Sequence, residues 1–140
     1  MVETVLSRAL KKYAVNPASE EYSRVIREFF WCVVNYNKLY FVEDKENADN
    51  ENGEEKKPLL PTSILDGDGK RYVVLFSRQP DGDEAKEFTS SDADSLARNI
   101  VLEEAVQGII LDMDIGASLI IPSESLLTII RSADDYRASL

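Results

Sequence analysis

Two stretches near the N-terminus have the hydrophobic spacing of amphipathic helices. Apolar side chains recur three and four residues apart at positions 2–13, and again, with a more aromatic stripe, at positions 22–33. Asn16 and Pro17 separate the two stretches. Because proline fits the first turn of a helix and asparagine is a favourable N-cap, we expect Asn16 to cap the second helix. The aromatic side chains along one face of this second helix predict that a large apolar part of the protein packs against that face.

Four apolar runs farther along the chain predict strands. They are residues 39–42, 72–76, 108–112 and 119–121. The 72–76 run is continuously apolar, which is typical of a central strand covered on both faces. A short turn separates the last two runs, so they predict a hairpin. Residues 59–62 predict an edge strand, because proline is confined to sheet edges and strand ends.

Weaker signals indicate further helices. A short helix fits the polar segment around 83–88. Ser91 and Asp92 favour a helix that reaches about residue 106, although 99–102 also fits an extended conformation. Ser123 is an expected cap for a last helix that carries four apolar residues: Leu126, Leu127, Ile129 and Ile130. We expect the tail, 133–140, to fray.

Together these elements predict one α+β domain over residues 1–140. Its sheet would be small, mixed or antiparallel, with four to five strands. Two N-terminal helices and one C-terminal helix would pack on that sheet. Residues 43–57 interrupt the pattern with seven acids, three lysines and one apolar residue. Because such a segment cannot bury enough surface to order itself, we expect a mobile surface loop.

The charge of the chain restricts its partners. It carries 26 acids and 16 bases, a net charge of −10. Nucleic acids and anionic membranes are polyanions, so a chain this acidic has no electrostatic reason to bind them. The start lacks the basic and apolar regions of a signal peptide, and no apolar run approaches the ~20 residues that span a bilayer. We therefore expect a cytoplasmic protein.

Histidine and the recognised catalytic motifs are missing, and although pairs of Asp and Glu remain able to do acid–base work, nothing singles out one pair. The chain has no histidine, the commonest general base and metal ligand, and no glycine-rich phosphate-binding or GxSxG motif. Its one cysteine, Cys32, lies in the apolar run 29–34 and is predicted to be a buried core residue. We therefore expect a protein without enzymatic activity or cofactor.

Two aspartate pairs resemble metal sites. Asp112 and Asp114 lie at the end of a predicted strand, as in haloacid-dehalogenase-type phosphatases, and would hold magnesium. Those enzymes, however, continue with a different sequence, and the return strand leaves no room for a crossover helix. Asp66 and Asp68 suggest a calcium loop, but Lys70 and the next arginine occupy positions of a ligand and of the turn glycine. A β-turn is the favoured interpretation there.

The acidity itself is the remaining signal. Acids are in local excess over 43–55, 81–94 and 103–114. This pattern serves solubility alone, or else forms a surface that attracts a basic protein and excludes wrong partners. The candidate partner-binding surface comprises six residues: Asp81, Asp83, Glu84, Glu87, Asp112 and Asp114.

Six different short motifs follow one another along the chain between about residue 4 and residue 131. They are Ala9-Leu10, Asn16-Pro17, Leu39-Tyr40-Phe41-Val42, Val74-Leu75-Phe76-Ser77, Gly108-Ile109-Ile110-Leu111 and Leu119-Ile120-Ile121-Pro122. In this order the chain resembles the N-terminal domain of the SseB (enhanced serine sensitivity) family of bacterial proteins. That family usually has Asn-Pro where this chain has Asp112-Met113. The resemblance implies no catalytic residues.

Three hypotheses of function follow. The first is a non-enzymatic cytoplasmic binding or regulatory module of the SseB type, which contacts an unidentified protein or forms a homo-oligomer. The second is an acidic inhibitor or immunity protein that neutralises a basic partner. The third is a metal-dependent hydrolase that uses Asp112 and Asp114.

Overall fold

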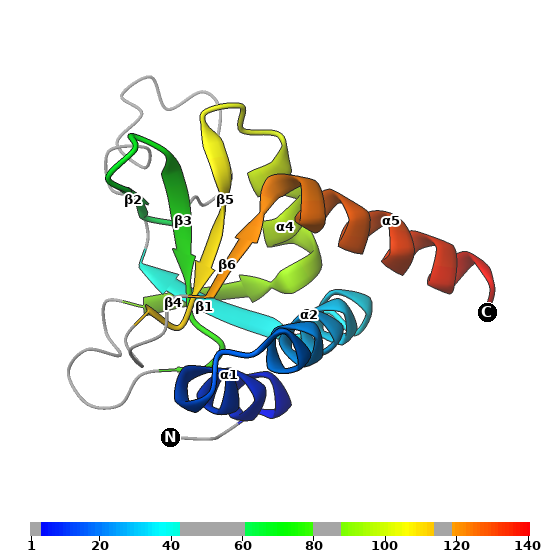
Figure 1. Ribbon diagram of the computed structural model, residues 1–140. Coiled ribbons are helices and arrows are strands. Elements are labelled where there is room, and N and C mark those ends of the chain that lie inside the picture. The colour runs from blue at the N-terminus through cyan, green and yellow to red at the C-terminus, as the bar shows by residue number, and fades with distance from the viewer. Residues whose placement is uncertain (1–3, 43–60, 80–87, 114–118) are drawn as a thin grey trace, which may run out of the picture.

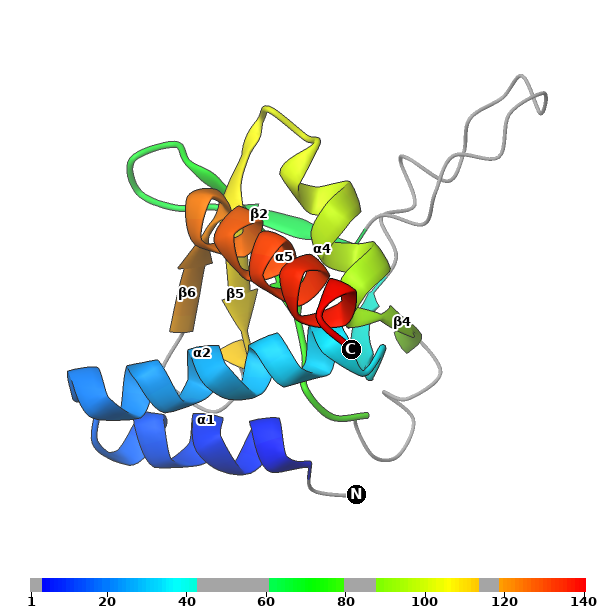
Figure 2. The same ribbon diagram turned by 90° about the vertical axis from the view of Figure 1, so that its right-hand side faces the viewer.

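Two packed helices begin the chain. The structure, a computed structural model, describes residues 4–42, 61–79, 88–113 and 119–140. Helices α1 (Val5–Val15) and α2 (Ser19–Val34) lie side by side (Figure 2). Thr4 and Ser7 form a reciprocal capping box at the start of α1, with N–O distances of 3.0 and 2.8 Å.

The prediction that Asn16 caps the second helix is wrong. Ala18 is the N-cap of α2, without a side-chain hydrogen bond. Asn16 instead ends α1, because its backbone N–H still donates to the carbonyl of Lys12 at 3.0 Å. Pro17 therefore belongs to the connection between the helices and not to the first turn of α2.

The strands form two hydrogen-bonded groups. β1 (Lys38–Val42) and β4 (Phe88–Asp92) pair antiparallel. The other group is a four-stranded sheet whose order is β2 (Ser63–Leu65), β3 (Arg71–Leu75), β5 (Val106–Leu111) and β6 (Leu119–Pro122). β3 and β5 are parallel, and the other neighbours are antiparallel. Tyr40 and Phe76 exchange backbone hydrogen bonds of 2.9 and 2.8 Å that join the two groups.

Most strand predictions are confirmed. β3 lies between β2 and β5, as expected of a central strand, and β5 with β6 forms the predicted hairpin. The edge strand is β2, slightly later than the predicted 59–62, and the first two of those positions lie outside the described residues. The helix predicted around 83–88 lies outside them too, except for Phe88, which begins β4. β4 itself was not predicted, because its sequence is mostly polar.

The described part of the chain has two further helices, α4 (Ala93–Val101) and α5 (Ser123–Ala138). Asp92 caps α4 as predicted, accepting the N–H of Ser95 at 2.8 Å, although the helix ends before residue 106. Ser123 is not a cap: Pro122 takes that position, and the Ser123 hydroxyl donates to the carbonyl of Val106 at 3.3 Å. In the described part of the chain, no helix is long and apolar enough to cross a membrane.

The predicted fraying of residues 133–140 is also wrong. α5 continues to Ala138, and Ala133 is fully buried. The hydrogen bonds of the Arg137 side chain explain why the last turns of α5 stay helical. Its guanidinium donates to the carbonyls of Val33 and Val34, at 2.5 and 3.3 Å, and to the carboxylate of Asp94, at 3.1 Å. The end of α5 is thereby bonded to the end of α2 and to the start of α4.

The core lies between the helices and one face of the four-stranded sheet (Figure 1). Side chains from all four described helices and from alternate positions of the strands meet there, among them Leu10, Phe29, Leu75, Leu96, Ile109, Ile121 and Leu126. Cys32 belongs to this core, as predicted, and burial raises the pKa of its thiol. The predicted α+β class, with helices packed on a mixed sheet, is confirmed.

Candidate functional site

The predicted acidic surface is described at one position only. Asp81, Asp83, Glu84, Glu87 and Asp114 lie outside the described residues. Asp112 is described, and its exposed fraction is 0%. The inclusion of Asp112 in a partner-binding surface is therefore wrong, because its side chain turns into the protein.

The buried carboxylate of Asp112 ties together the ends of the parallel strands β3 and β5. Its Oδ1 accepts the backbone N–H of Ser77 at 2.6 Å, and its Oδ2 accepts the Ser77 hydroxyl at 2.5 Å. The guanidinium of Arg78 lies 3.2 Å from Oδ2. Asp112 holds a positive φ of 48°, a conformation that aspartate tolerates better than most residues.

This geometry suits a structural role better than metal chemistry. A metal ion at Asp112 would have to displace the Ser77 donors and share the carboxylate with the Arg78 cation. Ser77 is buried as well, and its hydroxyl donates to a carboxylate rather than to a base such as histidine. The Ser77–Arg78–Asp112 cluster therefore stabilises the strand ends.

The second aspartate pair forms a turn, as predicted. Oδ1 of Asp66 accepts the backbone N–H groups of Asp68 and Lys70, at 2.9 and 2.8 Å. Gly69 adopts the positive φ of 79° that this turn between β2 and β3 requires. No group of three or more side chains within the described ranges is arranged to hold a metal ion.

The excess of negative charge lies outside the described ranges, which contain thirteen acids and twelve bases. Most of it belongs to the sequence of 43–57 and 81–87. Both segments connect to the same end of the β1–β4 pair: one follows Val42, the other precedes Phe88, and these two residues are cross-strand partners. The chain also returns to this point, since Thr62 N–H donates to the Val42 carbonyl at 2.8 Å.

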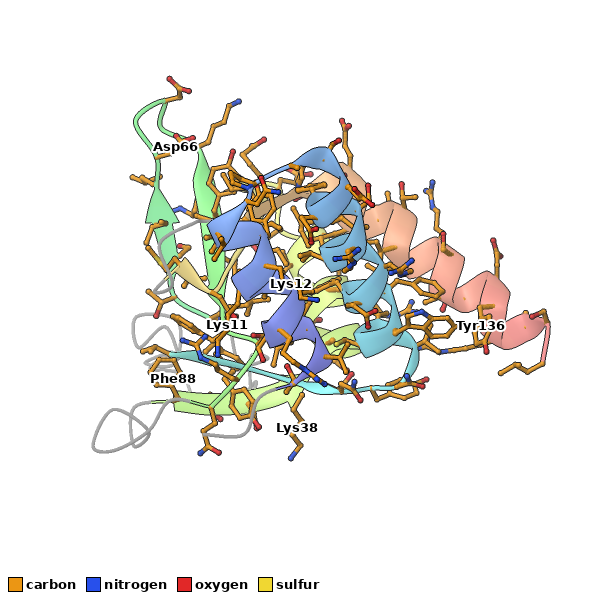
Figure 3. The ribbon with its side chains drawn as sticks, turned by 60° about the horizontal axis from the view of Figure 1, so that its bottom comes forward. Lys11, Lys12, Lys38, Asp66, Phe88 and Tyr136 are labelled. Carbon is orange, nitrogen blue, oxygen red and sulfur yellow. The ribbon has the colours of Figure 1, made fainter. Side chains whose placement is uncertain are left out.

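A group of aromatic rings lies at the opposite end of the molecule. Tyr136 of α5 makes edge-to-face contacts with Trp31 and Phe30 of α2, with ring centroids 5.3 and 6.3 Å apart, and Phe30 and Trp31 contact each other at 5.0 Å. Trp31 and Tyr136 remain 36% and 37% exposed. Figure 3 shows Tyr136 on the side of α5 that faces the end of α2. We call these three residues the aromatic surface.

Two arginines form ion pairs and hydrogen bonds beside the aromatic surface. Arg137, next to Tyr136, is fixed by the carbonyls at the end of α2 and by Asp94, and its guanidinium lies 4.5 Å from the centroid of the Tyr36 ring. A second arginine, Arg98, binds Asp94 and Asp134, and these carboxylates raise its pKa. These contacts hold the end of α5, and with it Tyr136, beside the end of α2.

This surface was not predicted from the sequence, although one signal for it was present. Trp31 falls outside the apolar spacing of the second helix, so the stripe that faces the core cannot include it. Tyr136 gave no such signal, because its segment was expected to fray. The packing of α5 against α2 in the core, together with the bonds of Arg137, brings Tyr136 beside α2.

No family model, curated protein or solved structure matches this chain. The resemblance to the SseB family accordingly stays a prediction.

Proposed function

We propose that this protein is a non-enzymatic, cytoplasmic binding or regulatory module of the SseB type that acts through protein–protein contacts. The observation that carries the proposal is the aromatic surface, in which Trp31 and Tyr136 pack against each other while about a third of each stays exposed. Tryptophan, tyrosine and arginine are the residues most enriched where truncation weakens protein interfaces most. A protein partner is favoured over nucleic acid or an anionic membrane because of the net charge of −10.

A capture experiment with matched variants tests this proposal. Tagged wild-type protein, Trp31→Ala and Tyr136→Ala would each be used as bait, with bound proteins quantified by mass spectrometry. Val15→Ala is the control, since Val15 is 88% exposed and ends α1, before the start of α2, whereas Trp31 lies in the last turn of α2. We expect the same binding species to be lost with both aromatic variants and kept with the control. If every species bound all four baits equally, the aromatic surface would not be a binding site.

The shared attachment of the two acidic segments favours a second candidate function. Segments 43–57 and 81–87 carry eleven acids and four bases between them, and both attach at the Val42–Phe88 pair. An inhibitor or immunity protein that neutralises a basic partner would benefit from such a concentration of charge, which accelerates association.

Charge removal and salt test this candidate. The test variant replaces four acids by their amides: Asp81→Asn, Asp83→Asn, Glu84→Gln and Glu87→Gln. We expect association with a basic partner to slow in this variant, and to slow in the wild type as salt rises. Unchanged association rates under both conditions would remove this candidate.

A further inference from the structure

We infer that the aromatic surface is the contact between two copies of this chain. The inference rests on the proposed function, because it names the partner of the same surface. In a symmetric dimer the same patch is used twice, so Trp31 of one copy would pack against Tyr136 of the other, and the reverse. The rings come from two neighbouring helices, α2 and α5. In a symmetric dimer, α2 of each copy can therefore lie against α5 of the other.

The distribution of charge favours a second copy at this place. Two chains of net charge −10 repel each other, and close contact is least costly where the acids are farthest away. The described ranges are nearly balanced, and the two acidic segments attach at the Val42–Phe88 pair. Figure 3 shows Phe88 and Tyr136 on opposite sides of the molecule. A dimer through the aromatic surface therefore keeps the attachment points of both acidic segments away from the interface.

In the same symmetric dimer, a basic residue beside the aromatic surface of one copy would lie opposite an acidic residue of the other. Arg27, one helical turn before Trp31, has a side chain that is 63% exposed, and Asp135, next to Tyr136, is exposed as well. When α2 of one copy lies along α5 of the other, each Arg27 gains an acidic neighbour in Asp135. Such pairs at the rim of an interface set its register and suppress wrong pairings more than they add affinity.

Sedimentation equilibrium on the full chain tests the inference, at about 10 mM and about 300 mM salt, where the screening length falls several-fold. We expect dimers whose dissociation constant decreases at the higher salt, because screening weakens the repulsion between the two acidic chains. This direction is opposite to that of a complex between this chain and a basic partner. Trp31→Ala should raise the dissociation constant about thirtyfold or more, as truncation of an interface anchor does. Val15→Ala should leave it unchanged.

A charge exchange provides a second test that does not depend on the rings. Arg27→Glu and Asp135→Arg each place like charges opposite one another, so each variant alone should dimerise more weakly than wild type. Mixing the two variants restores opposite charges in the heterodimer, which should form preferentially. Both substitutions are at exposed positions, so the fold should tolerate them.

The outcomes separate this inference from the proposed function. A chain that stays monomeric, while still capturing another protein through Trp31, would overturn the dimer and leave the binding module standing. A monomer without any Trp31-dependent partner would overturn both. A dimer that persists unchanged in Trp31→Ala, or that gains nothing from mixing the charge variants, would also overturn the inference.

Discussion

Replacing Asp112 should unfold the protein more readily than any surface change, because this carboxylate joins the ends of two parallel strands. It is fully buried, accepts two hydrogen bonds from Ser77 and lies 3.2 Å from the Arg78 guanidinium. Asp112→Asn keeps the shape of the side chain but removes its charge and one acceptor. Asp112→Ala removes every contact of the carboxylate, and Ser77→Ala removes only the hydroxyl.

The contacts set the order of the expected losses. Asp112→Asn turns one acceptor into a donor that faces Ser77 or Arg78, which should cost about 2–3 kcal/mol of unfolding free energy. Asp112→Ala gives up the whole buried pair and leaves alanine at a positive φ, so about 4–5 kcal/mol is expected. Ser77→Ala loses one hydrogen bond to a charged carboxylate but keeps the bond from the Ser77 backbone N–H, so about 1.5 kcal/mol is expected. Because domains are stable by only about 5–15 kcal/mol, Asp112→Ala should lose between about a third and nearly all of the stability at 25 °C.

Urea denaturation measures these losses. The chain has one tryptophan, Trp31, so its fluorescence and the far-ultraviolet circular dichroism give two independent records of one transition. We expect the order Asp112→Ala, Asp112→Asn, Ser77→Ala from most to least destabilised. An Asp112→Ala variant within about 0.5 kcal/mol of wild type would refute the structural role assigned to this carboxylate.

Three further outcomes are expected. Gly108→Ala should lower stability by about 1–3 kcal/mol, visible as a lower Tm, because the new Cβ would lie 2.8 Å from Cα of Pro122 and closer still to the Ile121 carbonyl; an unchanged Tm would contradict this. Arg137→Met should speed amide hydrogen exchange in the last turns of α5, since the bonds to α2 and to Asp94 are lost, whereas exchange at wild-type rates would show that those bonds do not hold the helix. Burial raises the pKa of the Cys32 thiol above its ordinary value of 9.0, so the unfolded chain loses that proton first and the unfolding free energy should fall as pH rises above about 9. In Cys32→Ala the unfolding free energy should fall less steeply above about pH 9, because the thiol no longer contributes. Parallel pH profiles for wild type and Cys32→Ala would exclude this contribution of the thiol.

Local patterns were sufficient where neighbouring residues decide the structure. The stripe of α2, the continuous apolar run of β3, the hairpin of β5 and β6, and the cap at Asp92 could all be predicted. In each case the side chains that set the conformation lie within a few positions of one another. The burial of Cys32 followed in the same way from the apolar run around it.

The candidate site could be predicted much less well than the fold. Composition and motifs indicated a protein without the usual catalytic residues, and charge singled out two acidic segments. Trp31 could have been recognised as an aromatic residue outside the core-facing stripe. Its partner Tyr136 could not, since nothing near it in the sequence indicates the ring contact with α2.

What the sequence determined by itself is the set of elements whose stability is local, together with the charge and the chemical groups that the chain can present. Tertiary structure alone decided the strand β4, the burial of Asp112, the order of the last turns of α5, and the aromatic surface at the molecule's far end. Each of these depends on a partner many positions away: β1 for β4, Ser77 for Asp112, and the carbonyl of Val33 for Arg137. A polar strand or a helix end is stable only when such a partner supplies its hydrogen bonds, and no local pattern of apolar and polar residues records which partner that will be.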